Sequence, residues 1–203
     1  MRNRKQLPLE ALRPFELELP AAPAPLDFSA IFGNAGPVEL EVGFGKGAVL
    51  LAAAQMRPDQ NYLGIEIDRG LERFVATRLA KRSLRNVKVI HGDATRLLGE
   101  YITPNSLAAV HVYCPDPWWK KRHHKRRVFT PEFARHIERA LAPGGELHLA
   151  TDVAAYFVIM TGLVCSATEL YPLRPPAAII ATNFEVKAIR RSKSVWRASY
   201  RKA

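Results

Sequence analysis

Five short apolar runs alternate with helix-forming stretches from Pro37 onward, and this alternation is the strongest constraint on the fold. Each run has the length of a buried strand, and strands joined by helical crossovers pair in parallel. The expected strands are Val38–Val42, Tyr62–Ile67, Val87–Ile90, Leu107–Tyr113 and Glu146–Ala150. The sequence therefore predicts an α/β protein with a doubly wound, mostly parallel sheet.

Local patterns predict the intervening helices. Ala48–Arg57 is rich in Ala and Leu, and the stretch Leu71–Leu79 places apolar side chains on one helical face. Thr130 is a typical N-cap, since Pro131 follows at the first helical position, and Gly144-Gly145 is expected to end that helix. These stretches supply the crossovers that a parallel sheet requires.

The remaining segments predict less. Residues 1–28 contain five prolines and are expected to form an irregular arm, a basic tail followed by a Pro/Ala linker, ahead of a single domain over residues 29–203. Val153–Thr168 carries no charge but is shorter than the ~20 residues of a membrane span, so it predicts a buried helix and no membrane partner. Glu169–Tyr200 favours strands without clear bounds.

Charge points to a polyanionic partner. The chain has 30 Lys and Arg against 19 Asp and Glu, a formal net charge of +11 and a pI near 10.0. No acidic residue follows Glu185, although seven Lys or Arg residues do. Such clustered positive charge is typical of nucleic-acid binding. The two cysteines have neither disulfide-framework nor zinc-ligand spacing, and no apolar leader is evident, so we expect a cytoplasmic protein without a metal.

The segment Cys114–Arg127, CPDPWWKKRHHKRR, directly follows the fourth expected strand. Its two prolines place Asp116 in a stiff loop, and ligands bind at such strand ends in open α/β sheets. Two tryptophans and six Lys or Arg residues follow, which suits a site for a base and its phosphates. A solvated basic turn is the alternative. We expect one tryptophan to stack on a base and the other to lie in the core, and His123 and His124 to contact RNA or solvent.

The first expected strand runs into a glycine-rich turn, G-x-G-x-G over Gly43–Gly47, with Glu41 two residues ahead of it. Such glycines allow a ligand to approach the backbone at a helix N-terminus. Glu66 ends the second strand and Asp93 follows the third, so three carboxylates are expected along one crevice. The turn resembles the cofactor loop of class I S-adenosylmethionine (AdoMet) methyltransferases.

The P-D-P-W loop with its basic run, together with Thr151-Asp152 and Thr182–Glu185, resembles the tRNA (guanine-N7)-methyltransferase family over roughly residues 32–185. The resemblance implies AdoMet as cofactor and transfer of its methyl group to N7 of a guanine in the tRNA variable loop. Asp116 would be catalytic. The cofactor residues that it implies are Glu41, Gly43, Gly45, Gly47, Glu66, Asp93, Ala94 and Asp116. The substrate residues are Lys120, Arg126, Arg127, Asp152, Thr182, Asn183, Phe184 and Glu185.

Two other functions are compatible with these patterns. One is methylation of an exocyclic amine, although those enzymes carry Asp/Asn-Pro-Pro-aromatic and Asp116-Pro117-Trp118 lacks the second proline. The other is a basic RNA-binding protein that keeps the fold without catalysis, and the intact glycines and carboxylates disfavour it. Both a monomer and a homodimer remain open.

Overall fold

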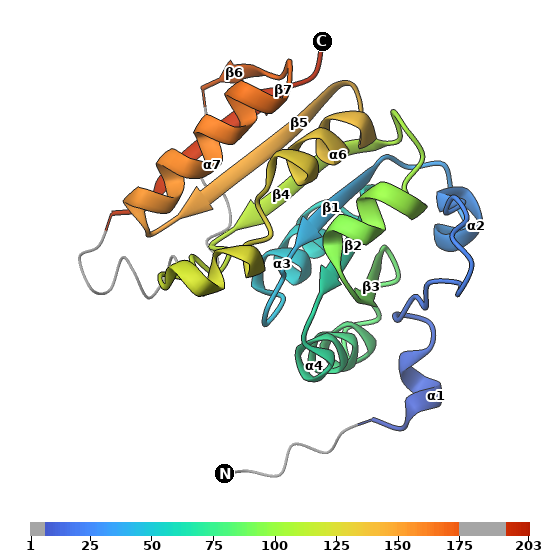
Figure 1. Ribbon diagram of the computed structural model, residues 1–203. Helices are drawn as coiled ribbons and strands as arrows, with labels where there is room; N and C mark the ends of the chain where they lie inside the picture. The colour runs from blue at the N-terminus through green and yellow to red at the C-terminus, as the bar shows by residue number, and fades with distance from the viewer. Residues whose placement is uncertain (1–6, 175–193) are drawn as a thin grey trace.

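The computed structural model describes residues 7–174 and 194–203 (Figure 1). A seven-stranded sheet runs through it in the order β3-β2-β1-β4-β5-β7-β6. The strands are β1 Val38–Val42, β2 Asn61–Glu66, β3 Val87–His91, β4 Leu107–Tyr113, β5 Leu141–Thr151, β6 Tyr171–Leu173 and β7 Trp196–Arg201. Strands β1 to β5 pair in parallel, whereas β7 pairs antiparallel with both β5 and β6. The predicted doubly wound, mostly parallel sheet is confirmed.

Helices cover both faces of the sheet. On one face lie α3 (Ala48–Met56) and α4 (Arg69–Ala80). The other face is covered by α5 (Ala94–Arg96), the π-helix η1 (Leu97–Tyr101), α6 (Pro131–Ala140) and α7 (Ala154–Ala167). Figure 1 shows α6 and α7 in front of the sheet and α3 behind it. Because helices alternate with parallel strands, every turn that follows strands β1 to β5 lies at the same edge of the sheet, the one formed by the carboxyl ends of these strands.

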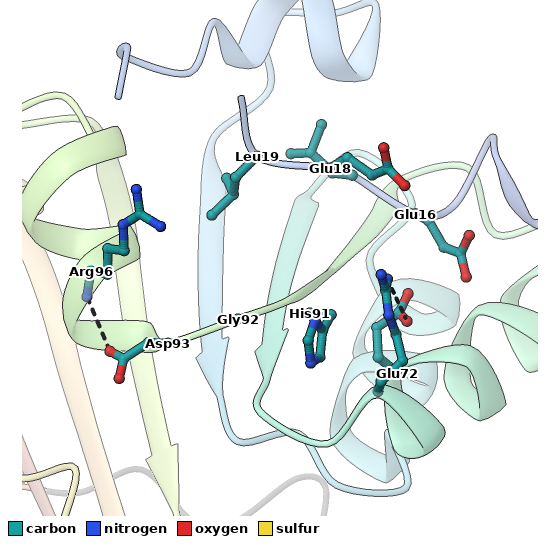
Figure 2. Close-up of a pocket in the computed structure, with 10 residues that line it drawn as sticks. Glu16, Glu18, Leu19, Glu72, His91, Gly92, Asp93 and Arg96 are labelled. Carbon is teal, nitrogen blue, oxygen red and sulfur yellow. Dashed lines mark hydrogen bonds and ion pairs between the residues drawn. The ribbon is translucent and has the colours of Figure 1, made fainter. Parts of the chain in front are cut away.

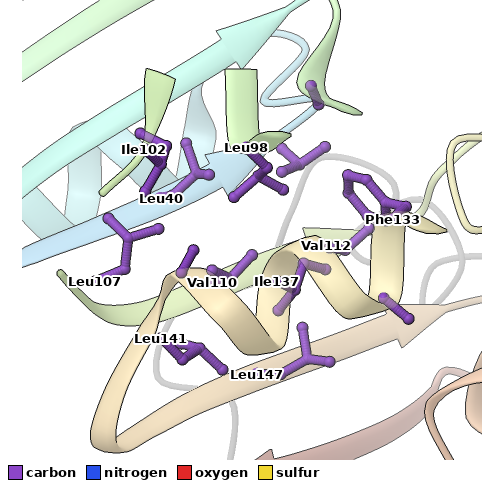
Figure 3. Packing of buried hydrophobic residues seen from close by; sticks show 14 of the residues in the cluster. Leu40, Leu98, Ile102, Leu107, Val110, Val112, Phe133, Ile137, Leu141 and Leu147 are labelled. Atoms are coloured by element: carbon purple, nitrogen blue, oxygen red, sulfur yellow. The ribbon is translucent and has the colours of Figure 1, made fainter. Parts of the chain in front are cut away.

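The larger core lies between the sheet and the second group of helices. Leu40, Val110 and Leu147 project from three strands toward Phe133 and Ile137 of α6 (Figure 3), and all five side chains are fully buried. Burying a side chain of this size contributes about 1.5–3 kcal/mol. The strands that carry the predicted site are therefore held rigidly.

The segment before residue 28, expected to be irregular, is partly ordered against the sheet. It contains α1 (Leu9–Leu12) and leads into α2 (Phe28–Phe32). Leu12 and Phe15 are buried with α4 and β3. The Leu17 amide donates to the Val89 carbonyl, and the Val89 amide donates to the Phe15 carbonyl, each at 2.8 Å. Residues 13–27 form no helix or strand, as expected, but α1 and the packing of Leu12 and Phe15 against the domain were not expected.

Two helix expectations also need correction. Helix α6 ends at Ala140, ahead of Gly144-Gly145, because Leu141 already pairs with Leu107 in the sheet. Helix α7 buries only one stripe, and Val158 stays 67% exposed, so it is a surface helix and not a buried one. An uncharged stretch does not distinguish the two cases. Within the described residues, no helix is long and apolar enough to span a membrane.

Candidate functional site

The strand order brings the acidic residues singled out in the sequence to one edge of the sheet. Asp93, Glu66, Glu41, Asp116 and Asp152 lie at or just beyond the carboxyl ends of β3, β2, β1, β4 and β5, which are neighbours in that order. Adjacent strands are about 4.8 Å apart, so the row from β3 to β4 spans roughly 14 Å. The connections reverse direction between β1 and β4, and the crevice at such a reversal is where doubly wound sheets bind ligands.

The glycine-rich turn leaves its backbone open to a ligand. Gly43, Gly45 and Gly47 have φ values of 69°, 54° and 67°, in the left-handed region that favours glycine. A Cβ atom at Gly43 or Gly45 would meet nothing within 4 Å, whereas one at Gly47 would lie 2.8 Å from the side chain of Val75. The first two glycines therefore border open space, and the third lets α3 pack closely against α4.

Glu66 closes the other side of this turn. Its Oε2 accepts a hydrogen bond from the Gly45 amide at 2.9 Å, and its Oε1 accepts one from the Asp68 amide at 3.1 Å. The carboxylate is 8% exposed, and each oxygen can accept a further bond from a hydroxyl group. Glu66 therefore positions the glycine turn, a role that the sequence did not predict. Its role as an acceptor for ribose hydroxyls stays a prediction.

Asp93 and Ala94 form the next turn along the edge. Oδ1 of Asp93 accepts bonds from the amides of Thr95 and Arg96, at 2.7 and 3.1 Å, and so caps α5 (Figure 2). Ala94 is 9% exposed. Ile67, the residue after Glu66, is 69% exposed at the same edge, although sequence reasoning placed it inside a strand. An exposed apolar side chain beside acceptor groups suits a nucleoside.

These groups fit an adenosine-bearing cofactor. The open space over Gly43 and Gly45 admits a ligand to the backbone, Glu66 offers acceptors for ribose hydroxyls, and Asp93 lies one strand further for an exocyclic amine. Glu41 is 5% exposed in β1, and the neighbouring strand β4 leads into the loop that carries Asp116. The residues predicted to hold AdoMet are therefore gathered along one continuous edge.

The loop after β4 is strained and tightly held. Cys114 and Trp118 have φ values of 49° and 44°, a region that costs a non-glycine residue roughly 1–3 kcal/mol. The Cys114 amide donates to the Ala150 carbonyl at 2.7 Å, and Arg127 Nε donates to the Pro117 carbonyl at the same distance. Asp116, between these anchors, is exposed at the edge. Strained loops persist where neighbouring contacts hold them, and they cluster at functional sites.

The aromatic and basic residues that follow do not behave alike. Trp119 is 66% exposed, and Trp118 is half-buried with Arg126 5.1 Å from its ring and His123 edge-on to it at 5.7 Å. The expectation that one tryptophan lies in the core is therefore wrong. Both tryptophans precede the 3-10 helix η2 (Lys121–Arg126), and neither belongs to the buried core.

The predicted substrate residues fall into three groups. Lys120 and Arg126 are exposed, as expected for groups that meet a polyanion. Arg127 is half-buried, with its guanidinium carbon 5.1 Å from the ring centre of Tyr156. Asp152 is half-buried after β5. Thr182, Asn183, Phe184 and Glu185 lie outside the described residues.

A pocket of about 400 Å³ borders the β3 end of this edge, between the N-terminal segment and α4 (Figure 2). Glu16 and Glu72 meet there, and Glu72 is 1% exposed. Glu16 Oε1 and Glu72 Oε2 are buried without a hydrogen bond among the described residues, and Arg69 is 3.8 Å from the latter atom. Burial, followed by the charge of Glu16, raises the pKa of Glu72 to about 7, although Arg69 and Arg73 act in the opposite direction.

We expect Glu72→Gln to stabilise the protein above neutral pH. Because the pKa of Glu72 rises from 4.5 to about 7, folding takes up a proton. This contribution to stability is fully present below pH 4.5 and is lost as the pH rises through 7. Glutamine stays neutral at every pH, so the variant does not lose this contribution as the pH rises. Its free energy of unfolding at pH 8 should exceed that of the wild type by about 1–3 kcal/mol, with little difference at pH 5.

Urea unfolding of variant and wild type at each pH measures this difference directly. The free energy of unfolding of the wild type has to be subtracted at each pH, because other groups also change it. Burial and the nearby His111 lower the pKa of His148 to about 4, which weakens the folded state as the pH falls below 6.5. Glu18→Gln, an exposed position on the same segment, is the matched control. A stabilisation of equal size at pH 5 and pH 8 would contradict a titrating Glu72.

Known proteins share both the sequence and the fold. Residues 35–198 match a family model described as a putative methyltransferase. The tRNA (guanine-N(7)-)-methyltransferase of Alkalilimnicola ehrlichii is 40% identical over an alignment of 205 positions, which covers 98% of this chain and 86% of that protein. Its namesake from Rhodopirellula baltica is 42% identical over an alignment of 193 positions, which covers 89% of this chain and 71% of that protein. A crystal structure of a SAM dependent methyltransferase from Aquifex aeolicus superposes with a TM-score of 0.58 at 12% identity, covering 83% of each chain, a likeness of fold alone.

Proposed function

This chain belongs to the tRNA (guanine-N7)-methyltransferase family, and from that premise we propose that it methylates N7 of a guanine in the tRNA variable loop. The protein is an AdoMet-dependent methyltransferase. The observation that carries the proposal is the position of Asp116, in a stiff loop at the crevice and next to a basic surface. We place the protein in the cytoplasm, because its proposed substrate is tRNA.

AdoMet, when bound, supplies a methyl group activated by a positively charged sulfur. The acceptor needs little chemical help, because guanine N7 has an in-plane lone pair and no proton at neutral pH. No side chain has to act as a general base. The work of this chain is then to place the guanine ring and to stabilise the charge that develops on it.

The residues divide this work by position. The turn Gly43–Gly47, together with Glu66 and Asp93, binds the cofactor along β1 to β3. Asp116 faces the guanine and accepts hydrogen bonds from N1 and N2, and its negative charge favours the ring as it becomes cationic. Lys120 and Arg126 neutralise tRNA phosphates. Asp152 and Thr182–Glu185 complete the contact with the substrate.

The identity of the methylated nucleoside tests this proposal. Incubation with tRNA transcript and methyl-labelled AdoMet, followed by digestion to nucleosides, should yield labelled 7-methylguanosine. A transcript with 7-deazaguanosine at the variable-loop guanine should take up no label, because a carbon replaces the acceptor nitrogen while the base-pairing edge is kept.

The two alternatives give different results in the same assay. Label in an exocyclic amine, in either transcript, would assign the other methyltransferase class. Binding of tRNA without any transfer of label would indicate a non-catalytic RNA-binding protein. A transcript with adenine at the variable-loop position is the control for the target base.

A further inference from the structure

The loop that carries Asp116 has few free backbone torsions. Pro115 and Pro117 fix their own φ angles, and Pro117 also restricts Asp116, the residue before it, to extended conformations. The direction of the Asp116 side chain therefore depends on the two ends of the loop, Cys114 and Trp118. Both have left-handed φ angles, which non-glycine residues adopt only when outside contacts hold them.

At each end a hydrogen bond to the main chain supplies such a contact. At the first, the Cys114 amide is bound to the carbonyl of Ala150 in β5. At the second, Arg127 Nε binds the Pro117 carbonyl at 2.7 Å, on the peptide that immediately precedes Trp118. The first contact uses the main chain of the sheet and is insensitive to side-chain identity. The second depends entirely on the side chain of Arg127.

The side chain of Arg127 is in turn held by a contact with helix α7. Its guanidinium lies over the ring of Tyr156, which is 1% exposed on α7. Burial raises the pKa of Tyr156, whereas a hydrogen bond with the Phe129 backbone and the charge of Arg127 act in the opposite direction. The neighbouring Arg126 differs, because it is exposed and contacts Trp118 instead.

We propose that Arg127 is a positioning residue that links Tyr156 of α7 to the Pro117 carbonyl and thereby aims Asp116 at the acceptor base. The proposal rests on the proposed function, since it assigns Asp116 the role of contacting the guanine. It separates two adjacent arginines that the sequence presents as equivalent phosphate contacts. Arg126 meets tRNA, and Arg127 holds the loop.

Arg127→Lys tests this assignment, because lysine keeps the charge but has no Nε–H at this position and no planar group to stack. The single-turnover rate at saturating tRNA and AdoMet should fall roughly tenfold through misplacement of Asp116. The dissociation constant for tRNA should stay within about twofold, with an unchanged salt slope. The matched variant Arg126→Ala should instead weaken tRNA binding and reduce the salt slope by about 0.7–0.9. A full saturating rate in Arg127→Lys would overturn the proposal.

A second pair of variants leaves Arg127 in place. Tyr156→Leu removes the ring beneath the guanidinium and should reproduce the rate loss, whereas Tyr156→Phe keeps the ring and should rescue it. Thermal unfolding and AdoMet affinity of each variant separate this effect from a general loss of structure. Equal rates in the Leu and Phe variants would contradict a link through Tyr156.

A spectroscopic measurement keeps the test independent of the reaction. In a protein whose Trp119 and Trp196 are replaced by phenylalanine, Trp118 is the remaining tryptophan. Arg127→Lys in that background should increase acrylamide quenching of Trp118 as the loop loosens, and unchanged quenching would refute the link. Methylation at another atom would refute the proposed function, while this comparison would still decide the role of Arg127.

Discussion

Asp116→Asn is expected to lower the single-turnover rate of methyl transfer by roughly 10²–10³, the size of effect seen when one preorganised electrostatic group is lost. The amide keeps the shape of the side chain but removes the negative charge that faces the developing cation. AdoMet and tRNA affinities should change far less than the rate. Rapid-quench measurement of label transfer at saturating concentrations of both substrates gives this rate without interference from product release.

The pH dependence sharpens the test. Because guanine N7 attacks without losing a proton, the wild-type rate should be nearly flat from about pH 6.5 to 8.5. His123→Ala and His124→Ala should leave that profile flat. Asp59→Asn, an exposed aspartate in the turn before β2, is the control for loss of one surface charge. A rate that climbs tenfold per pH unit, and loses the climb in a histidine variant, would instead indicate a substrate atom that must be deprotonated.

Glu66→Ala is expected to weaken AdoMet binding by about 3 kcal/mol, or roughly 100-fold. Two losses add at this position, since the carboxylate holds the Gly45 amide at 2.9 Å and offers acceptors to the ribose hydroxyls. Isothermal titration calorimetry with AdoMet and with its demethylated product measures the change. Both ligands should lose affinity equally, because neither contact involves the methyl group.

The control for this variant is Glu132→Ala, whose side chain is 68% exposed on α6. It should bind AdoMet as the wild type does. NAD provides the competing ligand, since it also carries an adenosine group. Tighter binding of NAD than of AdoMet by the wild type would show that this edge serves another cofactor.

The sheet could be predicted because each of its parallel strands is a short, contiguous run of mostly apolar residues. Apolar runs such as Val38–Val42 and Leu107–Tyr113 are strands in the structure, with the predicted bounds. Gly43, Gly45 and Gly47 do have the left-handed backbone that their spacing implied. Parallel pairing then brings the ends of successive strands to one edge. That general rule located the acidic row without knowledge of a single tertiary contact.

What escaped prediction depends on contacts between residues distant in the chain. The packing of Leu12 and Phe15 beside β3 needs the surface that α4 presents, and their own neighbours in sequence are prolines and charges. The raised pKa of Glu72 likewise depends in part on the charge of Glu16, 56 positions earlier. In the run of basic residues, composition cannot tell Arg126 from Arg127. Their contacts in the folded chain distinguish them, since Arg127 binds the Pro117 carbonyl and lies over Tyr156 whereas Arg126 lies over Trp118.

The pairing of residues 15–17 with Val89 also protects the protein from aggregation through an exposed edge strand. A bare edge strand invites pairing with the edge of another molecule, which leads to aggregation. The N-terminal segment occupies the β3 edge, and in the described part of the chain the opposite edge is β6, a strand of three residues that includes Pro172. Proline cannot donate a ladder hydrogen bond, and so short a strand is a poor template. Removing residues 1–20 would uncover β3, and self-association through that edge would follow.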